Sequence, residues 1–174
     1  PPFEIPKHVY DAWDARTKGE GMEKLWNNKF AEYKKAFPKE AAEFQRRTKG
    51  ELPANWTDHA AKAIAQINEK AETIATRKAS QNAINALVPV LPEFLGGSAD
   101  LTGSNLTNWT GAHHVSGKKP GNYISYGVRE FGMAAAMNGI ALHGGLLPFG
   151  GTFLTFSDCS RNALRMAALM EIRV

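Results

Sequence analysis

The chain has 174 residues, of which 43% are hydrophobic and 22% are charged, and its formal net charge is +4. These values are typical of a folded globular protein and exclude a disordered chain, a collagen and a disulfide-dense scaffold. No apolar run reaches the about 18 residues of a transmembrane helix. A single cysteine, Cys159, and the lack of a secretory leader predict a reducing, cytoplasmic location.

The first part of the chain is predicted to be helical and exposed to water. Residues 1–78 hold 15 of the 21 Lys and Arg residues and 12 of the 17 Asp and Glu residues. Because the two signs alternate, we expect a solvated amphipathic surface and no nucleic-acid-binding stripe. Apolar spacing and helix-breaking residues predict helices after Pro6, over residues 22–37, from Pro38 to near Gly50 and over residues 59–69, with a turn at residues 18–22. A further helix, over residues 76–87, is predicted to be largely buried.

The second part is glycine-rich and apolar, with 13 of the 16 glycines after residue 78. The pattern predicts strands over residues 94–98, 123–127 and 146–149, and the start of a fourth strand at residues 171–174. It also predicts a loop over residues 99–121, a buried helix over residues 129–142 and a further helix over residues 153–170. Alternating apolar strands and helices indicate an α/β fold with a parallel sheet and helices on both faces. Because the first residue is not Met and the last residues read as a new strand, we expect a piece of a longer protein.

Ligands of open parallel sheets bind at the carboxyl ends of the strands. The segments in that position are residues 98–104, 127–130 and 150–156. Within them, Phe153 and Phe156 are three residues apart and would share one face of a helix. Such a pair usually belongs to a core, but next to two glycines at a strand end it could instead line a flat heteroaromatic ring.

Glu130 is the most informative residue of these segments, because it begins a helix that is otherwise small and apolar. In a structural interpretation, it stabilises the helix N-terminus by about 0.3–1 kcal/mol, with Arg129 as a possible ion partner. In a functional interpretation, burial disfavours the charged form of the carboxyl, which can then share a proton with a ring nitrogen of a ligand. Position alone favours the structural interpretation, and both stay open at this stage.

Several other site types are not expected. His113 and His114 are adjacent, lack a third ligand nearby, and more readily fit an exposed loop than a metal site. The sequence also lacks the nucleophile elbow of α/β-hydrolases, a dinucleotide-binding glycine motif and a Walker loop.

Four stretches carry a family resemblance: residues 74–80 (IATRKAS), 94–101 (FLGGSADL), 121–133 (GNYISYGVREFGM) and 152–156 (TFLTF). In this order and spacing they resemble bacterial transketolase, and the resemblance extends over essentially the whole chain. It implies that residues 1–71 are a helical inter-domain segment and residues 72–174 a pyrimidine-binding α/β domain, incomplete at its C-terminal end.

The resemblance also implies an activity. Transketolases use thiamine diphosphate and a divalent cation, Mg²⁺ or Ca²⁺, to move a two-carbon ketol unit from a ketose phosphate to an aldose phosphate. They act in the pentose phosphate pathway and the Calvin cycle as homodimers, with the site formed between two subunits. The Gly-Asp-Gly motif and downstream Asn that hold the cation and diphosphate are absent from this chain, so we expect the chain to be inactive alone and to contribute no metal ligand.

By the same resemblance, Glu130 is the catalytic residue that bonds to the ring nitrogen of the aminopyrimidine. The cofactor and substrate residues that it implies are Phe153 and Phe156 as an aromatic wall, Asp100 as an acid close to the cofactor, and Arg77 and Ser104 as ligands of the sugar phosphate. Cys159 stands where many relatives have a further pocket tyrosine, and Phe131 where many have histidine. The alternatives are a related thiamine diphosphate enzyme (dihydroxyacetone synthase, phosphoketolase or deoxyxylulose phosphate synthase) and a non-catalytic pairing domain.

Overall fold

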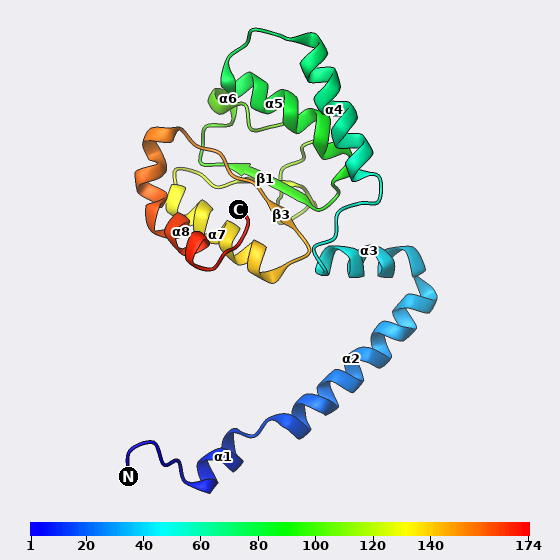
Figure 1. Cartoon of the computed structure of the whole chain (residues 1–174), viewed down its shortest axis with the longest axis vertical. Coiled ribbons are helices and arrows are strands. Elements are labelled where there is room, and N and C mark those ends of the chain that lie inside the picture. Colours follow the sequence, from blue (N-terminus) through cyan, green and yellow to red (C-terminus); the bar gives the residue numbers. More distant parts are fainter. The chain divides into compact units, whose positions relative to one another are not determined.

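The computed structural model describes all 174 residues, which form two compact units, residues 1–45 and 46–174. Helices are the only regular structure of the first unit, which contains α1 (Lys7–Trp13), α2 (Arg16–Ala36) and the first part of α3 (Pro38–Thr48) (Figure 1). The helices expected after Pro6 and from Pro38 are therefore confirmed. None of the helices combines the length and the apolar composition that crossing a lipid bilayer requires.

Aromatic side chains join α2 to α3 within the first unit. The rings of Trp26 and Phe30 stack with their centroids 5.9 Å apart, and the Phe30 centroid lies 5.7 Å from that of Phe44 on α3. Trp26 and Phe30 are four residues apart, so they lie on the same side of the helix. The apolar spacing that predicts an amphipathic helix therefore also builds this contact.

The prediction of a turn at residues 18–22 is wrong, because α2 continues through Gly19 and Gly21. The Gly19 amide donates a helical hydrogen bond of 2.7 Å to the Ala15 oxygen. Neither glycine has a positive φ. A glycine in an exposed helix costs only about 0.5–1 kcal/mol relative to alanine, and a helix of 21 residues tolerates that cost.

Gly21→Ala is expected to stabilise the protein by about 0.5–1 kcal/mol, because a methyl group there would meet no atom within 4 Å. Urea-induced unfolding followed by far-UV circular dichroism measures the change. Gly50→Ala is the matched control: its methyl group would also meet no atom, but φ is +70°, so this variant should be destabilised. A loss of stability in Gly21→Ala would contradict this account of α2.

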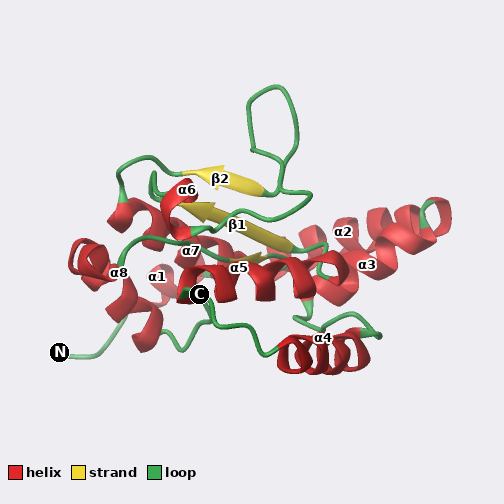
Figure 2. Cartoon of the chain, turned by 90° about the horizontal axis from the view of Figure 1, so that it is seen from above, coloured by secondary structure: helices red, strands yellow, loops and turns green.

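The second unit is built on a three-stranded parallel sheet in the order β2-β1-β3. The strands are β1 (Phe94–Ser98), β2 (Tyr123–Ser125) and β3 (Leu147–Pro148). Gly97 of β1 is paired with Ile124 of β2, and Leu95 with Pro148 of β3. Figure 2 shows β1 and β2 running side by side in the same direction. The parallel α/β fold is therefore confirmed.

Helices cover both faces of this sheet, as expected. In Figure 1, α4 and α5 lie above β1, and α7 and α8 lie below it. The helices of this unit are α4 (Trp56–Lys70), α5 (Thr76–Leu87), α6 (Thr102–Asn105), α7 (Glu130–His143) and α8 (Ser157–Leu169), with 3₁₀ turns η1 (Val88–Val90) and η2 (Leu154–Phe156).

Three expectations for the second unit need correction. Residues 171–174 form no strand: after α8 the chain reverses at Glu171, whose φ is +54°, and Ile172 donates its amide hydrogen bond back to Ala167. The last helix begins at Ser157 and not at residue 153, because the 3₁₀ turn η2 precedes it. Finally, α5 has no fully buried residue, since α4 and the loops around it cover only part of its surface.

The core lies between the sheet and α7. Ala99, Met133 and Met137 are buried together, and Tyr126 packs against them. The helix expected to be buried, α7, is buried on this side and against α8, where the buried Asn138 side chain donates to the Ala163 backbone oxygen (2.9 Å), whereas Phe131 and Leu142 are exposed. Its apolar surface therefore extends beyond what this chain covers.

An ion pair between Arg46 and Glu93 anchors the start of β1. The Arg46 guanidinium donates two hydrogen bonds of 2.9 Å to the Glu93 carboxylate and one of 2.6 Å to the Glu51 backbone oxygen. Only 15% of the Arg46 side chain and 5% of the Glu93 side chain are exposed. Burial by itself would raise the pKa of Glu93, but the hydrogen bonds and charge of Arg46 hold that pKa below its ordinary value of 4.5.

Glu93→Gln is expected to destabilise the protein at neutral pH by about 3–5 kcal/mol, because it removes the negative charge that faces the nearly buried Arg46 guanidinium. Folding lowers the pKa of Glu93, so the stabilisation is complete above pH 4.5 and is lost as the pH falls through the lowered pKa. Urea unfolding of both proteins at neutral and at acidic pH measures this dependence.

The stability difference between wild type and Glu93→Gln should therefore shrink in acid, and a difference that stays constant would contradict the assignment. Asp11→Asn is the control, since the Lys7–Asp11 pair has a similar N–O distance, 2.7 Å, but is exposed to solvent. Exposed pairs contribute little to stability, so this variant should unfold like the wild type.

Candidate cofactor and substrate site

The carboxyl ends of the three strands meet at one level of the sheet. The Tyr126 amide donates to the Ser98 oxygen (3.1 Å), and the Gly151 amide donates to the Gly97 oxygen (3.1 Å). The Ala99 amide then returns a bond of 3.1 Å to the Gly151 oxygen. Three loops therefore leave the sheet together, and they are the three segments in which the sequence predicts a site.

Glu130 is the first residue of α7 and is only 9% exposed. No hydrogen bond or ion pair of the structure involves its side chain. The guanidinium of Arg129 donates to the Tyr126 backbone oxygen, 2.9 Å away, and so is not the ion partner that the sequence suggests. The carboxyl therefore sits at a helix N-terminus, which favours a negative charge, and keeps its hydrogen-bonding capacity for another group.

Phe153 and Phe156 form a stacked pair, with ring centroids 6.3 Å apart and an angle of 19° between the rings. They do not share an α-helix: Phe153 is extended, and Phe156 ends the 3₁₀ turn η2. Residues three apart lie on the same side of a 3₁₀ turn, which is why the rings still face one another. Phe153 is 40% and Phe156 38% exposed, so both rings present apolar surface to solvent.

Gly150 brings α7 close to the segment that carries these rings. A Cβ atom at Gly150 would overlap the Met137 sulfur and lie 3.0 Å from the Met133 sulfur. With both methionines in their present positions, only glycine fits here. The helix that begins at Glu130 is therefore packed directly against the backbone that leads from β3 to Phe153.

Asp100 and Ser104 follow β1 at the same edge and are exposed. Asp100 has a φ of +62°, so the chain turns sharply there, and Ser104 lies on the short helix α6. The Leu101 amide donates to the Ser98 hydroxyl oxygen, 3.1 Å away, which fixes the start of this turn to the strand.

Arg77 is exposed near the start of α5. Because α5 ends just before β1 begins, its first residues lie toward the carboxyl end of that strand. Two hydrogen bonds join α5 to the loop that follows α6. The Gln81 side-chain amide donates to the Asn108 backbone oxygen (3.1 Å), and the Thr110 backbone amide donates to the Asn85 side-chain oxygen (2.8 Å). The structure thus joins the helix of Arg77 to the loop that directly follows the helix of Ser104.

The six predicted site residues therefore lie on segments that meet at one edge of the sheet. Among them, the rings of Phe153 and Phe156 contact one another. The structure adds Thr152, whose hydroxyl oxygen is buried without a hydrogen-bond partner beside Phe153. The sequence gives no sign of this, because burial of one hydroxyl depends on contacts from distant segments. A carboxyl without a protein partner and two flat apolar rings suit a heteroaromatic ring with polar nitrogens.

The histidines of the loop before β2 form no such site. His114 contacts the Ser125 hydroxyl with its Nδ1 atom, 2.9 Å away, and lies edge-on to Tyr123. Both histidines are exposed. The structure contains no cluster of three or more His, Cys, Asp or Glu side chains that could hold a metal ion.

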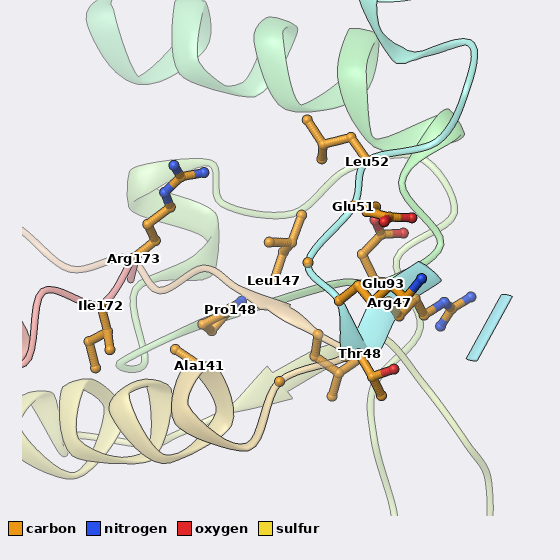
Figure 3. Close-up of a pocket in the computed structure, with 15 residues that line it drawn as sticks. Arg47, Thr48, Glu51, Leu52, Glu93, Ala141, Leu147, Pro148, Ile172 and Arg173 are labelled. Atoms are coloured by element: carbon orange, nitrogen blue, oxygen red, sulfur yellow. The ribbon is translucent and has the colours of Figure 1, made fainter. Parts of the chain in front are cut away.

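A separate cavity of about 460 Å³ lies at the opposite end of the strands (Figure 3). Glu93, just before β1, and Leu147, at the start of β3, line it together with Arg47, Ile172 and Arg173. None of the predicted site residues lines this cavity. It is therefore distinct from the carboxyl edge and has no part in the predicted site.

Comparison with known proteins agrees with this reading of the fold. The sequence profile described as "Transketolase, pyrimidine binding domain" matches residues 72–174, and that described as "Transketolase, thiamine diphosphate binding domain" matches residues 1–53. Transketolase 1 of Vibrio cholerae is 57% identical over 173 residues, and transketolase 1 of Escherichia coli is 58% identical over 172 residues. Each alignment covers 99% of this chain but 26% of the relative, so the chain spans about a quarter of their length.

Solved structures give the same result. A Pichia stipitis transketolase in complex with sedoheptulose 7-phosphate superimposes with a TM-score of 0.83 at 36% identity, over 99% of this chain and 26% of that one. For the Campylobacter jejuni transketolase the TM-score is 0.71 at 30% identity, over 98% of this chain and 24% of that one. Since the pyrimidine-domain profile alone covers more than half of the residues, the chain belongs to the transketolase family.

Proposed function

We propose that the protein carrying this chain is a transketolase, which transfers a two-carbon ketol unit from a ketose phosphate to an aldose phosphate. This chain would supply the pyrimidine-binding part of the site. The observation that carries the proposal is Glu130, a nearly buried carboxyl without a protein partner at the carboxyl edge of a parallel sheet. A purely structural pairing domain would need neither this carboxyl nor the exposed stack of Phe153 and Phe156.

The residues present fit thiamine diphosphate. Glu130 would hold the ring nitrogen of the aminopyrimidine, Phe153 and Phe156 would cover its flat face, and Asp100 would lie close to the cofactor. When bound, thiamine diphosphate supplies the nucleophilic carbon and the electron sink for breaking a carbon–carbon bond.

Glu130 would act by moving a proton. Its carboxyl would give a proton to the ring nitrogen and take that proton back during turnover. The helix N-terminus behind it stabilises the carboxylate that remains after donation. The two phenylalanines would exclude water from the bound ring and so strengthen this hydrogen bond in apolar surroundings.

Arg77 and Ser104 would bind the sugar phosphate. A guanidinium and a hydroxyl donor suit a phosphate group, and both side chains are exposed on segments that the Gln81–Asn108 contact joins. The Pichia stipitis structure named above contains a sugar phosphate, which supports this substrate class.

The remaining parts of the site would come from outside this chain. We infer a divalent cation held by a diphosphate-binding domain, and a second subunit that completes the site in a homodimer. The exposed apolar side of α7, with Phe131 and Leu142, supports such a partner. We also retain residues 1–71 as an inter-domain segment and 72–174 as the pyrimidine-binding domain, with a cytoplasmic role in the pentose phosphate pathway or the Calvin cycle.

Glu130→Gln in the full-length protein is expected to keep the fold and to lower kcat by about 10²–10⁴-fold. The amide has nearly the same shape but cannot give and take back a proton. Ketol transfer between a ketose phosphate and an aldose phosphate measures the loss, and thermal unfolding checks the fold. Glu69→Gln, which changes an exposed carboxyl on α4, is the control and should leave the rate unchanged. Unchanged turnover of Glu130→Gln would contradict the proposed mechanism.

The isolated chain of 174 residues is expected to show no ketol transfer, even with thiamine diphosphate and Mg²⁺ added. It lacks the Gly-Asp-Gly motif and contains no cluster of metal ligands. A coupled assay of the isolated chain, with the full-length protein as the positive control, tests this. A clear rate from the chain alone would show that the diphosphate and cation need no second domain.

A further inference from the structure

A chain of buried side-chain hydrogen bonds runs beneath the predicted site. The Tyr123 hydroxyl lies 2.8 Å from both the Thr102 and the Thr107 hydroxyl oxygens. From Thr107 the chain continues to Asn105 (2.9 Å), from Asn105 to Ser98 (3.2 Å), and from Ser98 to the Gly151 backbone oxygen (3.1 Å). Tyr123 and Ser98 are each only 1% exposed and Thr107 is 5% exposed, whereas Thr102 and Asn105 are half-buried, so water competes little for the bond between Tyr123 and Thr107.

The direction of every bond follows from the number of protons available. Thr107 donates its single hydroxyl proton to the Asn105 side-chain oxygen, which can only accept. At Tyr123 it must therefore accept, so Tyr123 donates to Thr107. The single Tyr123 proton is then committed, and the Thr102 hydroxyl must donate to Tyr123. The bonds thus point one way, from Thr102 to Gly151, and each polarises the next.

This chain joins the two sides of the predicted site. It begins at Thr102, the first residue of the helix that carries Ser104, and ends at Gly151, two residues before Phe153. Steric fit supports the same connection: a Cβ atom at Gly151 would overlap the Thr107 methyl group and lie 3.2 Å from the Asn105 amide nitrogen. Thr107 is therefore packed closely against Gly151, and a shift of Thr107 would change the space available to the Gly151 backbone.

We propose that Tyr123 is a positioning residue, whose hydroxyl holds the substrate loop (residues 99–107) and the aromatic segment (residues 151–156) in one arrangement. The two ligands that this inference concerns, the sugar phosphate and thiamine diphosphate, are taken from the proposed function. Tyr123 is proposed to contact neither ligand. It acts through Thr102 and Thr107, so its removal should loosen the binding of sugar phosphate and of thiamine diphosphate together.

In the full-length protein, Tyr123→Phe is expected to raise the KM of the ketose phosphate and the Kd of thiamine diphosphate, each by about three- to tenfold. The kcat at saturation should change by less than about twofold, because Glu130 is untouched. Steady-state kinetics gives the KM and kcat values, and titration calorimetry gives the Kd without relying on activity. Tyr126→Phe is the matched control, since Tyr126 is half-buried in the core but its hydroxyl makes no hydrogen bond.

Changes at Thr107 test the same connection independently. Thr107→Val removes the hydroxyl and should reproduce the effect of Tyr123→Phe, whereas Thr107→Ser keeps the hydroxyl and should restore values near the wild type. The double variant of Tyr123→Phe and Thr107→Val should be no weaker in binding than either single variant, because one broken chain is not broken twice. If Tyr123→Phe does not fold, the proposal is tested by comparing the KM and Kd values of Thr107→Val with those of Thr107→Ser.

Several results would overturn the proposal. Unchanged KM and Kd values in Tyr123→Phe would do so, as would fully multiplicative effects in the double variant. A lower yield of folded protein with normal KM and Kd would assign Tyr123 to stability alone. A wild-type protein that binds no thiamine diphosphate would instead refute the proposed function, so the two failures are distinguishable.

Discussion

The whole arrangement depends on the alignment of three parallel strands at their carboxyl ends. Backbone hydrogen bonds pair Ser98 of β1 with Ser125 of β2, and an isolated bridge pairs it with Gly151 beyond β3. Because side chains alternate between the faces of a sheet, a slip of one residue would turn every following side chain to the other face. The alignment therefore decides that Glu130, Asp100 and Phe153 emerge from one edge, although they are distant in sequence.

Features that depend on local sequence are predictable here. The runs before Gly96 and Gly150 predict β1 and β3, and the apolar spacing of residues 22–37 predicts most of α2. Prediction fails where local signals conflict with longer-range structure. Gly19 and Gly21 suggest a turn, yet the helical hydrogen bonds on either side continue through them. Residues 99–121 contain the composition of a loop, and only contacts with β1 and β2 select the short helix α6 within it.

The same division applies to the site. Glu130 stands out in the sequence as a lone acid in an apolar helix, and Phe153 and Phe156 as a pair beside two glycines. Tyr123 and Thr107 do not stand out, since their importance lies in a bond between residues 16 positions apart. The lack of an ion pair between Arg129 and Glu130 is equally invisible in the sequence, because the arginine is engaged by a backbone oxygen at the preceding turn.

The Gly151 backbone oxygen accepts two hydrogen bonds, one from the Ala99 amide and one from the Ser98 hydroxyl, each 3.1 Å long. Both of its lone pairs are thus occupied, and a ligand finds no acceptor in the backbone at that point. Recognition is left to the side chains on either side, at residues 100–104 and 152–156. Evolution can therefore retune ligand preference by exchanging those side chains without rebuilding the scaffold that supports them.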